Sequence, residues 1–203
     1  EIARELIQKK KVNLGGEELE AAVMFCDIRN FTPLSEKMGA AEVVAFLNEY
    51  FRYITPAINL NNGVINKFLG DAVMAVYTPL LGSSDYAADA VRAAAGMRRS
   101  LAEFNASGKM PFKVDFGIGI HAGRLVAGNI GTFSRLEYTF IGDTVNVAAR
   151  LQSKAKDLGT DVVISAEAVA KARGPLGAAA SFESLGKTAL KGKAGTLEVY
   201  KLL

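Results

Sequence analysis

Short apolar runs that predict strands alternate along the chain with longer stretches that have helical spacing. The most informative run covers residues 64–77, VINKFLGDAVMAVY, and predicts two short strands joined by a tight turn at Gly70 and Asp71. A Gly-Asp pair between apolar runs is a hairpin signal, and it would hold the Asp71 carboxylate rigidly at an exposed tip. Another apolar run, residues 21–28, carries Asp27 near its end. Two predicted strands thus each present an acidic side chain.

The remaining pattern predicts an alternation of helices and strands without internal repeats. Thr32 and Pro33 favour a helix start, with a capping hydroxyl followed by proline at the first helical position. Apolar spacing predicts further helices over residues 41–60, 84–105, 144–156 and 166–171, strands over 112–120, 125–130, 136–141, 161–165, 182–185 and 197–202, and a loop over 174–177. The succession of strand, helix, hairpin, helix and strand indicates an α+β fold. We expect a ferredoxin-like βαββαβ core with C-terminal additions.

The first residues have a different character from the rest of the chain. Residues 1–16 combine a short helical pattern, the lysines of positions 9–11 and a glycine-containing loop, and they predict an N-terminal helical connector. Residues 17–203 are then one domain. Because the chain opens at Glu1 rather than at Met, we expect a longer parent protein with a sensor or membrane region upstream.

Composition narrows the classes of function. Half of the 203 residues are hydrophobic, which is enough for one domain with a sizeable core. The 24 basic and 21 acidic residues leave a net charge of +3, so the charge predicts no nucleic-acid partner. Cys26 is the single cysteine, which excludes an internal disulfide and fits a reducing compartment. No apolar run reaches the roughly 18 residues that a membrane-spanning helix needs.

The two acidic residues in apolar surroundings are candidates for metal binding. An aspartate within a hydrophobic strand is costly to bury unless it is paired or bound to a metal. If Asp27 and Asp71 lie on neighbouring strands, they provide two hard oxygen ligands of the kind that Mg²⁺ and Mn²⁺ prefer.

Polar residues on a predicted helix form another candidate site. Asn146 and Arg150 are four residues apart, so they share one helical face. An amide and a guanidinium together suit a cluster of negatively charged oxygens, since arginine offers a fixed fork of donors. An exposed polar face without a ligand explains the same spacing equally well. The single histidine, His121, is interpreted as a structural, hydrogen-bonded residue.

Four segments together resemble the catalytic domain of the class III nucleotidyl cyclases, the adenylyl and guanylyl cyclases. They are FCDIRNFT at 25–32, NKFLGD at 66–71, GIGIHAG at 117–123 and YTFIGDTVNVAAR at 138–150. One such motif is weak, whereas four in this order and at these separations are specific. The resemblance covers about residues 17–203.

The resemblance implies a two-metal mechanism. Asp27 and Asp71 would hold two divalent cations, Mg²⁺ or Mn²⁺, with help from the carbonyl oxygen of Ile28. Backbone amides around Phe31 and Thr32 would face the triphosphate, as turns of the chain often do for anions.

It also implies roles for residues later in the chain. Arg150 would stabilise charge on the α-phosphate while Asn146 orients the ribose. Lys191 is similar to the family's lysine that binds the terminal phosphates, and Arg135 is a weaker candidate for the same role.

The choice of base depends on two positions. Lys67 stands where adenylyl cyclases of the family have lysine and guanylyl cyclases usually have glutamate. Its partner position holds Thr139 rather than the aspartate of many adenylyl cyclases, which matches a bacterial-type subset. Lys67 can donate to adenine N1 and the Thr139 hydroxyl can accept from the N6 amine, so we expect ATP to be preferred over GTP.

Because the family takes the metal carboxylates from one subunit and the base-reading and Asn/Arg residues from the other, we expect a head-to-tail homodimer. The resulting hypothesis is a cytoplasmic adenylyl cyclase that forms 3′,5′-cyclic AMP and pyrophosphate in signal transduction. Guanylyl cyclase activity and a catalytically inactive nucleotide-binding regulatory module are the alternatives. A diguanylate cyclase or other palm-type enzyme fits less well, because its glycine- and acid-rich turn signature is absent.

Overall fold

The computed structural model describes residues 16–132 and 135–203, with the side chains of positions 135 and 136 left out of the description. The predicted connector lies outside the described residues, apart from Gly16. The elements in chain order are β1 (Gly16–Ile28), α2 (Phe31–Ser35), α3 (Ala40–Leu60), β2 (Val64–Leu69), β3 (Ala72–Tyr77), the 3₁₀ turn η1 (Pro79–Leu81), α4 (Tyr86–Ala106), β4 (Phe116–Thr132), β5 (Arg135–Ile141), α5 (Asp143–Lys154), β6 (Val162–Ser165), α6 (Ala166–Leu176), η2 (Gly177–Ala179), β7 (Phe182–Ala189) and β8 (Thr196–Leu202).

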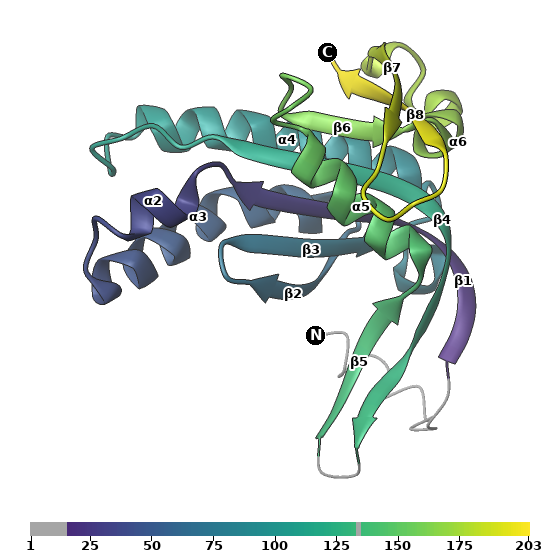
Figure 1. The fold of residues 1–203 in the computed structure, drawn as a ribbon, viewed down its shortest axis with the longest axis horizontal. Coiled ribbons are helices and arrows are strands. Elements are labelled where there is room, and N and C mark those ends of the chain that lie inside the picture. Colours follow the sequence, from purple (N-terminus) through teal and green to yellow (C-terminus); the bar gives the residue numbers. More distant parts are fainter. Residues whose placement is uncertain (1–15, 133–134) are drawn as a thin grey trace.

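The strands form one sheet, whose order confirms the predicted ferredoxin-like core. It runs β2-β3-β1-β4-β6-β8-β7, and β5 pairs only with β4. The first four strands are antiparallel to their neighbours and are connected with α3 and α4 in βαββαβ order. The C-terminal addition begins with β6, which runs parallel to β4, and continues through α6 to β8 (Figure 1).

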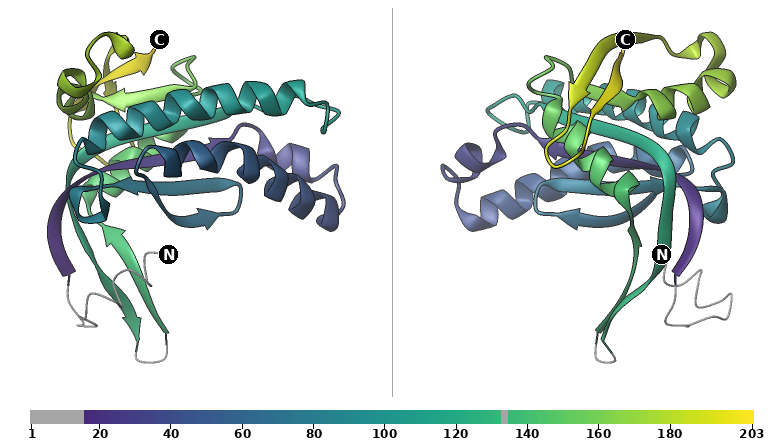
Figure 2. Two further views of the ribbon diagram at one scale, coloured as in Figure 1. Left: turned by 180° about the vertical axis from the view of Figure 1, so that it is seen from behind. Right: turned by 45° about the vertical axis from the view of Figure 1, so that its right-hand side comes forward.

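The helices lie on both faces of this sheet. α3 and α4 run side by side across one face, and α5 crosses the other (Figures 1 and 2). The larger core lies on the α3/α4 face, where fully buried side chains include Tyr50, Tyr77, Met97 and Phe104. Residues along a strand point alternately to opposite faces. Met24 and Cys26 of β1 accordingly enter this core, whereas Val23 faces α5.

Glycines on β4 allow α5 to approach the sheet at backbone contact. A Cβ atom added to Gly119 would lie 2.1 Å from the backbone nitrogen of Gln152 and 2.3 Å from the carbonyl oxygen of Ala148. Gly117 and Gly123 face the same helix, with more room. The glycines of the GIGIHAG segment therefore set the position of the helix that carries Asn146 and Arg150.

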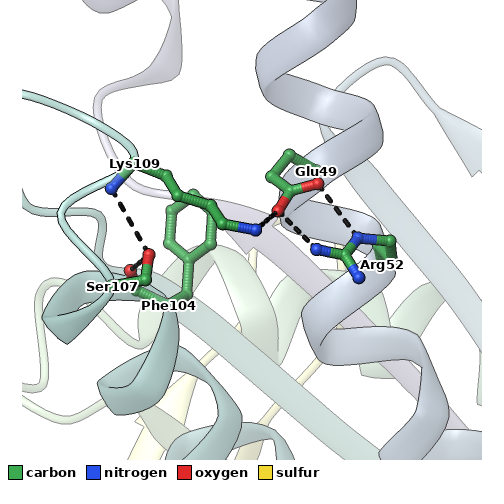
Figure 3. A network of polar contacts seen from close by, with 5 residues as sticks. All are labelled: Glu49, Arg52, Phe104, Ser107 and Lys109. Carbon is green, nitrogen blue, oxygen red and sulfur yellow. Dashed lines mark hydrogen bonds and ion pairs between the residues drawn. The ribbon is translucent and has the colours of Figure 1, made fainter.

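A polar network joins α3 to the segment after α4 (Figure 3). The Glu49 carboxylate pairs with Lys109 and with Arg52 one turn further along α3. The Ser107 hydroxyl donates to the carbonyl oxygen of Phe104 at 2.6 Å and closes the end of α4. The exposed ion pairs add little stability by themselves, because water and salt screen them. They join the middle of α3 to the segment that follows α4, at the surface of the α3/α4 layer.

The predicted strands 112–120 and 125–130 are wrong as separate elements. Residues 116–132 form the single strand β4, because β1 offers an unbroken partner from Gly16 to Ile28. Beyond this pairing, β4 continues with β5 into a two-stranded arm that extends away from the body (Figure 1). The local sequence pattern predicted an interruption of the strand near Gly123 and Arg124. Pairing with β1 continues through both positions, so β4 is unbroken there.

Helix boundaries also differ from the prediction, most clearly at the start of α2 and the end of α6. α2 begins at Phe31 rather than after Thr32, and Asn30 precedes it in the left-handed conformation, with φ of 56°. Asparagine tolerates this conformation better than most residues. α6 continues to Leu176, past the predicted end at position 171. Pro175 is accommodated there because Gly174 has no Cβ atom to clash with the proline ring. Among the helices of the described ranges, none has the length and hydropathy needed to cross a bilayer.

Candidate active site

Asp27 and Asp71 meet at one end of the β1–β3 pair. The last register pair of these strands is Cys26 with Val73, which places Asp27 beside the turn that joins β2 to β3. That turn consists of Gly70 and Asp71, as predicted, and Gly70 takes a positive φ of 66°. Asp27 follows the alternation of Val23 along β1, so its side chain lies on the α5 side of the sheet.

The electrostatics of Asp27 reflect this close approach. Burial, a hydrogen bond with Asp71 and the negative charge of Asp71 together raise the pKa of the Asp27 carboxyl to about 7, against a smaller lowering by the backbone N–H of Ile28. Two carboxyl groups that share a proton in this way need a positive charge to be ionised together.

This pair fits a divalent cation but does not complete its coordination shell. The described residues contain no group of three or more His, Cys, Asp or Glu side chains that could hold a metal. The apolar side chain of Ile28 is buried in the core on the α3/α4 face of the sheet. Ile28 could therefore bind a cation only through its carbonyl oxygen. A bound cation would therefore take further oxygen ligands from water or from a substrate.

The segment after β1 offers backbone donors. The Phe31 ring stacks on Phe46 with 6.4 Å between ring centroids, which anchors the start of α2 on the core. Asn30 precedes the helix without a side-chain cap. The first N–H groups of a helix have no partner within it, so Phe31 and Thr32 can donate to an anion.

Lys67 and Thr139 come together across β2 and β5. The Thr139 hydroxyl donates to the Oδ1 atom of Asn66, the neighbour of Lys67, at 3.3 Å. The Lys67 ammonium forms an ion pair with Glu137, two residues before Thr139. The sequence analysis missed Glu137. Its position two residues before Thr139 could have identified it, because residues i and i+2 of a strand lie on the same face.

Arg150 and Lys191 form another group, around α5. Asn146 is exposed and Arg150 is half-buried on this helix. A Cβ atom added to Gly192 would lie 3.6 Å from Nη2 of Arg150, so the Lys191–Gly192 segment passes beside the guanidinium. Lys193 binds the Asp143 carboxylate at 2.7 Å. Lys191 has no ion-pair partner in the described ranges and remains available to a ligand.

The predicted site residues thus lie in separate groups within one chain. Across the described residues, no hydrogen bond or ion pair joins the two aspartates to Asn146, Arg150 or Lys191. The side chain of Arg135 lies outside the description.

His121 has the structural role that the sequence indicated. It is 7% exposed, and its Nδ1 atom lies 2.7 Å from the Ser165 hydroxyl, which also accepts from the Ala168 N–H at the start of α6. Burial lowers the pKa of His121, against the opposing charge of Glu167. The neutral ring fixes the junction between β4, β6 and α6.

Comparison with protein families gives one match over nearly the whole chain. Residues 17–203 match the family described as the adenylate and guanylate cyclase catalytic domain. Adenylate cyclase 1 of Rhizobium meliloti is 36% identical over 211 residues, a match that covers 100% of this chain and 31% of that protein. The adenylate cyclase of Anabaena cylindrica is 38% identical over 153 residues, covering 72% of this chain and 30% of that protein. The chain thus spans about a third of the length of these relatives.

Solved structures agree with this match. The adenylyl cyclase CyaB from P. aeruginosa has a TM-score of 0.80 at 28% identity, covering 94% of this chain and 96% of that one. The guanylyl cyclase Cya2 has a TM-score of 0.82, also at 28% identity, covering 93% of each chain. Both kinds of cyclase therefore share this fold.

Proposed function

The chain belongs to the family of adenylate and guanylate cyclase catalytic domains, and on that premise we propose that it is an adenylyl cyclase converting ATP to 3′,5′-cyclic AMP and pyrophosphate. The observation that carries this choice is the proximity of Lys67 and Thr139 through Asn66. Adenine presents an acceptor at N1 and donors at its N6 amine. The Lys67 ammonium matches the first and the Thr139 hydroxyl matches the second. Guanine presents a donor at N1, which the ammonium cannot accept.

Asp27 and Asp71, with the carbonyl of Ile28, are the residues that would hold two divalent cations, Mg²⁺ or Mn²⁺. When bound, such cations lower the pKa of the ribose 3′-hydroxyl and neutralise charge on the departing pyrophosphate. The two carboxylates repel each other when both are ionised. A bound cation would offset this repulsion, which supports a metal-binding role for the pair.

The other residues bind and orient the nucleotide. The N–H groups of Phe31 and Thr32, together with Lys191 and Arg135, bind the phosphates. Asn146 orients the ribose so that its 3′ oxygen lies in line with the α-phosphorus. As that oxygen gives its proton to solvent water and bonds to phosphorus, the bond from the α-phosphorus to the pyrophosphate oxygen breaks. Arg150 stabilises the charge on the α-phosphate during this step.

We assign the complete site to the interface of a head-to-tail homodimer. No hydrogen bond or ion pair among the described residues joins the two aspartates to Asn146, Arg150 or Lys191, and this supports the assignment. So do the apolar side chains on the arm, where Val126, Ile130 and Ile141 are each 44–48% exposed. Val126 and Ile141 lie opposite each other in the β4–β5 register, which gives the arm an apolar patch that a second copy would cover. We place the domain in the cytoplasm, within a parent protein that has a sensor or membrane region upstream.

Guanylyl cyclase activity is the alternative that one observation favours. The Glu137 carboxylate beside Lys67 is an acceptor, and guanine N1–H and its 2-amino group are donors. If Glu137 turned towards the base, it would favour GTP. Replacing Glu137 by Gln should then lower kcat/KM for GTP and leave that for ATP within about threefold.

The proposed function is tested by cyclic nucleotide formation from ATP and from GTP, each with Mg²⁺ and with Mn²⁺. We expect cyclic AMP, and a Lys67→Glu variant should lose most of its activity with ATP. Cyclic GMP as the main product would make the chain a guanylyl cyclase. The absence of both products from a protein that dimerises and binds nucleotide would make it a regulatory module.

A further inference from the structure

A surface hollow of about 420 Å³ lies at the end of β1, beside the segment that leads into α2. Its walls come from that segment, from α2, from the chain between α4 and β4, and from the chain between α5 and β6. Its polar lining consists of Arg29, Asn30, Lys37, Lys113, Asp115 and Lys156. We call it the basic hollow, since four of these side chains are cationic and one is acidic.

The cations of the basic hollow are not neutralised by the protein. In the part of the chain that the structure describes, no carboxylate lies within 4.0 Å of the charged groups of Arg29, Lys37, Lys113 or Lys156. Lys156 donates to the side-chain oxygen of Asn30 at 3.0 Å, a neutral acceptor. Like charges held together cost free energy unless a counter-ion compensates them. This arrangement is suited to an anionic ligand.

Arg29 supplies an independent indication. One of its Nη atoms donates to the carbonyl oxygen of Thr160 at 2.5 Å, which fixes the guanidinium at the edge of the hollow. Its Nε atom is buried and has no hydrogen-bond partner among the residues that the structure describes. Unsatisfied buried donors are rare and indicate an unrecorded partner or a functional constraint.

The side chains that line the basic hollow differ from the carboxylate pair. Phe112 in its wall packs against Phe46, in the core under α3 and α4, whereas Asp27 faces the α5 side of the sheet. The hollow adjoins the end of β1 through Arg29 and Asn30, which follow Ile28, and through Asp115, whose carbonyl oxygen accepts from the Arg29 N–H at 2.9 Å.

We propose that the basic hollow binds a phosphate-type oxyanion with more than one negative charge, of which pyrophosphate is the simplest. Arginine and lysine together suit such a ligand, because the guanidinium donates in a fixed fork and each ammonium adds a point charge. A volume of about 420 Å³ accommodates two linked phosphate groups and is at the small end of ligand pockets. The ligand is either a free anion or the phosphate end of a nucleotide.

Calorimetric titration of the dimeric protein with pyrophosphate in EDTA tests the proposal, because the aspartate pair repels anions when no divalent cation is present. The variant Lys37→Gln/Lys113→Gln removes two exposed charges from the hollow and should weaken binding at least about tenfold. The charge-matched control Arg99→Gln/Lys187→Gln and the variant Lys191→Ala should bind as the unchanged protein does. Unaltered melting temperatures would show that the variants fold.

Parallel titrations with inorganic phosphate and ATP identify the source of the anion. If ATP competes and its binding is equally sensitive to Lys37→Gln/Lys113→Gln, the hollow receives the phosphates of a nucleotide. If Lys37→Gln/Lys113→Gln weakens the binding of pyrophosphate and of inorganic phosphate but not that of ATP, the hollow receives a free anion. Pyrophosphate binding that is absent at millimolar concentration, or unchanged in that double variant, overturns the proposal. Loss of binding in Lys191→Ala alone would assign the anion to the α5 group instead.

Discussion

The central feature at the scale of single residues is the pair of carboxyl groups of Asp27 and Asp71. Burial and the proximity of Asp71 raise the pKa of Asp27 to about 7, so the folded chain binds more protons than the unfolded chain between about pH 4 and 7. The contribution of this pair to stability therefore falls as pH rises through that window. Active and binding sites often lower the stability of the ligand-free protein in this way.

Replacing Asp71 by Asn should stabilise the cation-free protein and abolish cyclase activity. In EDTA at pH 8 we expect a melting temperature about 2–4 °C higher, which corresponds to about 1 kcal/mol for a chain of this length after allowance for solvent screening. The gain should disappear at pH 5, where Asp27 is already protonated. Thermal unfolding with and without Mn²⁺ measures both effects.

The control for this substitution is Asp85→Asn, which removes an exposed carboxylate at the start of α4. It should change neither the cation-free melting temperature nor the stabilisation by Mn²⁺. If Asp71→Asn gained as much stability from Mn²⁺ as the unchanged protein, Asp71 would not be a metal ligand.

For His121 we predict a pH dependence of stability with the opposite sign to that of Asp27. Burial lowers its pKa in the folded chain, so the unfolded chain binds more protons once the pH is below about 6.5. The free energy of unfolding should therefore fall as the pH decreases from about 6.5. In His121→Gln this part of the pH dependence should be absent, as urea unfolding at pH 7.5 and pH 5.5 would show. An equal fall in both proteins would contradict a buried neutral His121.

Individual residues could be predicted from sequence where their neighbours are local in the chain. The turn that presents Asp71 and the apolar strand that carries Asp27 are both short-range signals, and β1 and β3 prove to be neighbours. The contact of Glu137 with Lys67 depends on how β5 lies against β2. No sequence pattern between the two residues predicts that these strands approach each other. The unpaired cations of the basic hollow likewise come from four separate segments.

At the scale of elements, the close approach of α5 to β4 depends chiefly on Gly119, the most tightly packed of the glycines that face the helix. Gly119→Ala should lower the free energy of unfolding by about 3 kcal/mol or more, because the new methyl group meets backbone atoms of α5 that cannot rotate away. Cyclase activity should fall as well, since the helix carries Asn146 and Arg150. Chemical denaturation and the rate of cyclic nucleotide formation are the measurements.

Gly117→Ala is the matched control, on the same strand and facing the same helix. Its Cβ atom would come no closer than 3.3 Å to Gln152, so we expect a cost below about 1.5 kcal/mol and near-normal activity. If the two variants lost stability equally, close packing at Gly119 would not be what positions α5.

Helices and strands were predictable in kind, while their ends depended on tertiary partners. The helix predicted over residues 41–60 is observed as α3, Ala40–Leu60, because its apolar spacing is long and regular. β4 begins four residues later than the strand predicted from position 112 and joins it to the strand predicted over 125–130, since β1 and β5 supply partners along its length. The glycines of β4 were recognised as part of a motif, but their packing role requires knowledge of which helix crosses them.

At the scale of the whole molecule, the order of elements was sufficient to predict the ferredoxin-like core. The homodimer stays a prediction, because the structure consists of a single chain. The arm formed by β4 and β5 and its exposed apolar residues are what the fold contributes to that hypothesis.

Mixing two inactive variants tests the account most directly. Asp71→Ala lacks a metal carboxylate and Arg150→Ala lacks the α-phosphate residue, so each should form dimers without cyclase activity. In an equal mixture that exchanges subunits, half of the dimers combine both variants, and each of these has one intact site. The account predicts that cyclic AMP formation recovers to about a quarter of the unchanged protein's rate. No recovery in a mixture shown to contain mixed dimers would contradict a site shared between two chains.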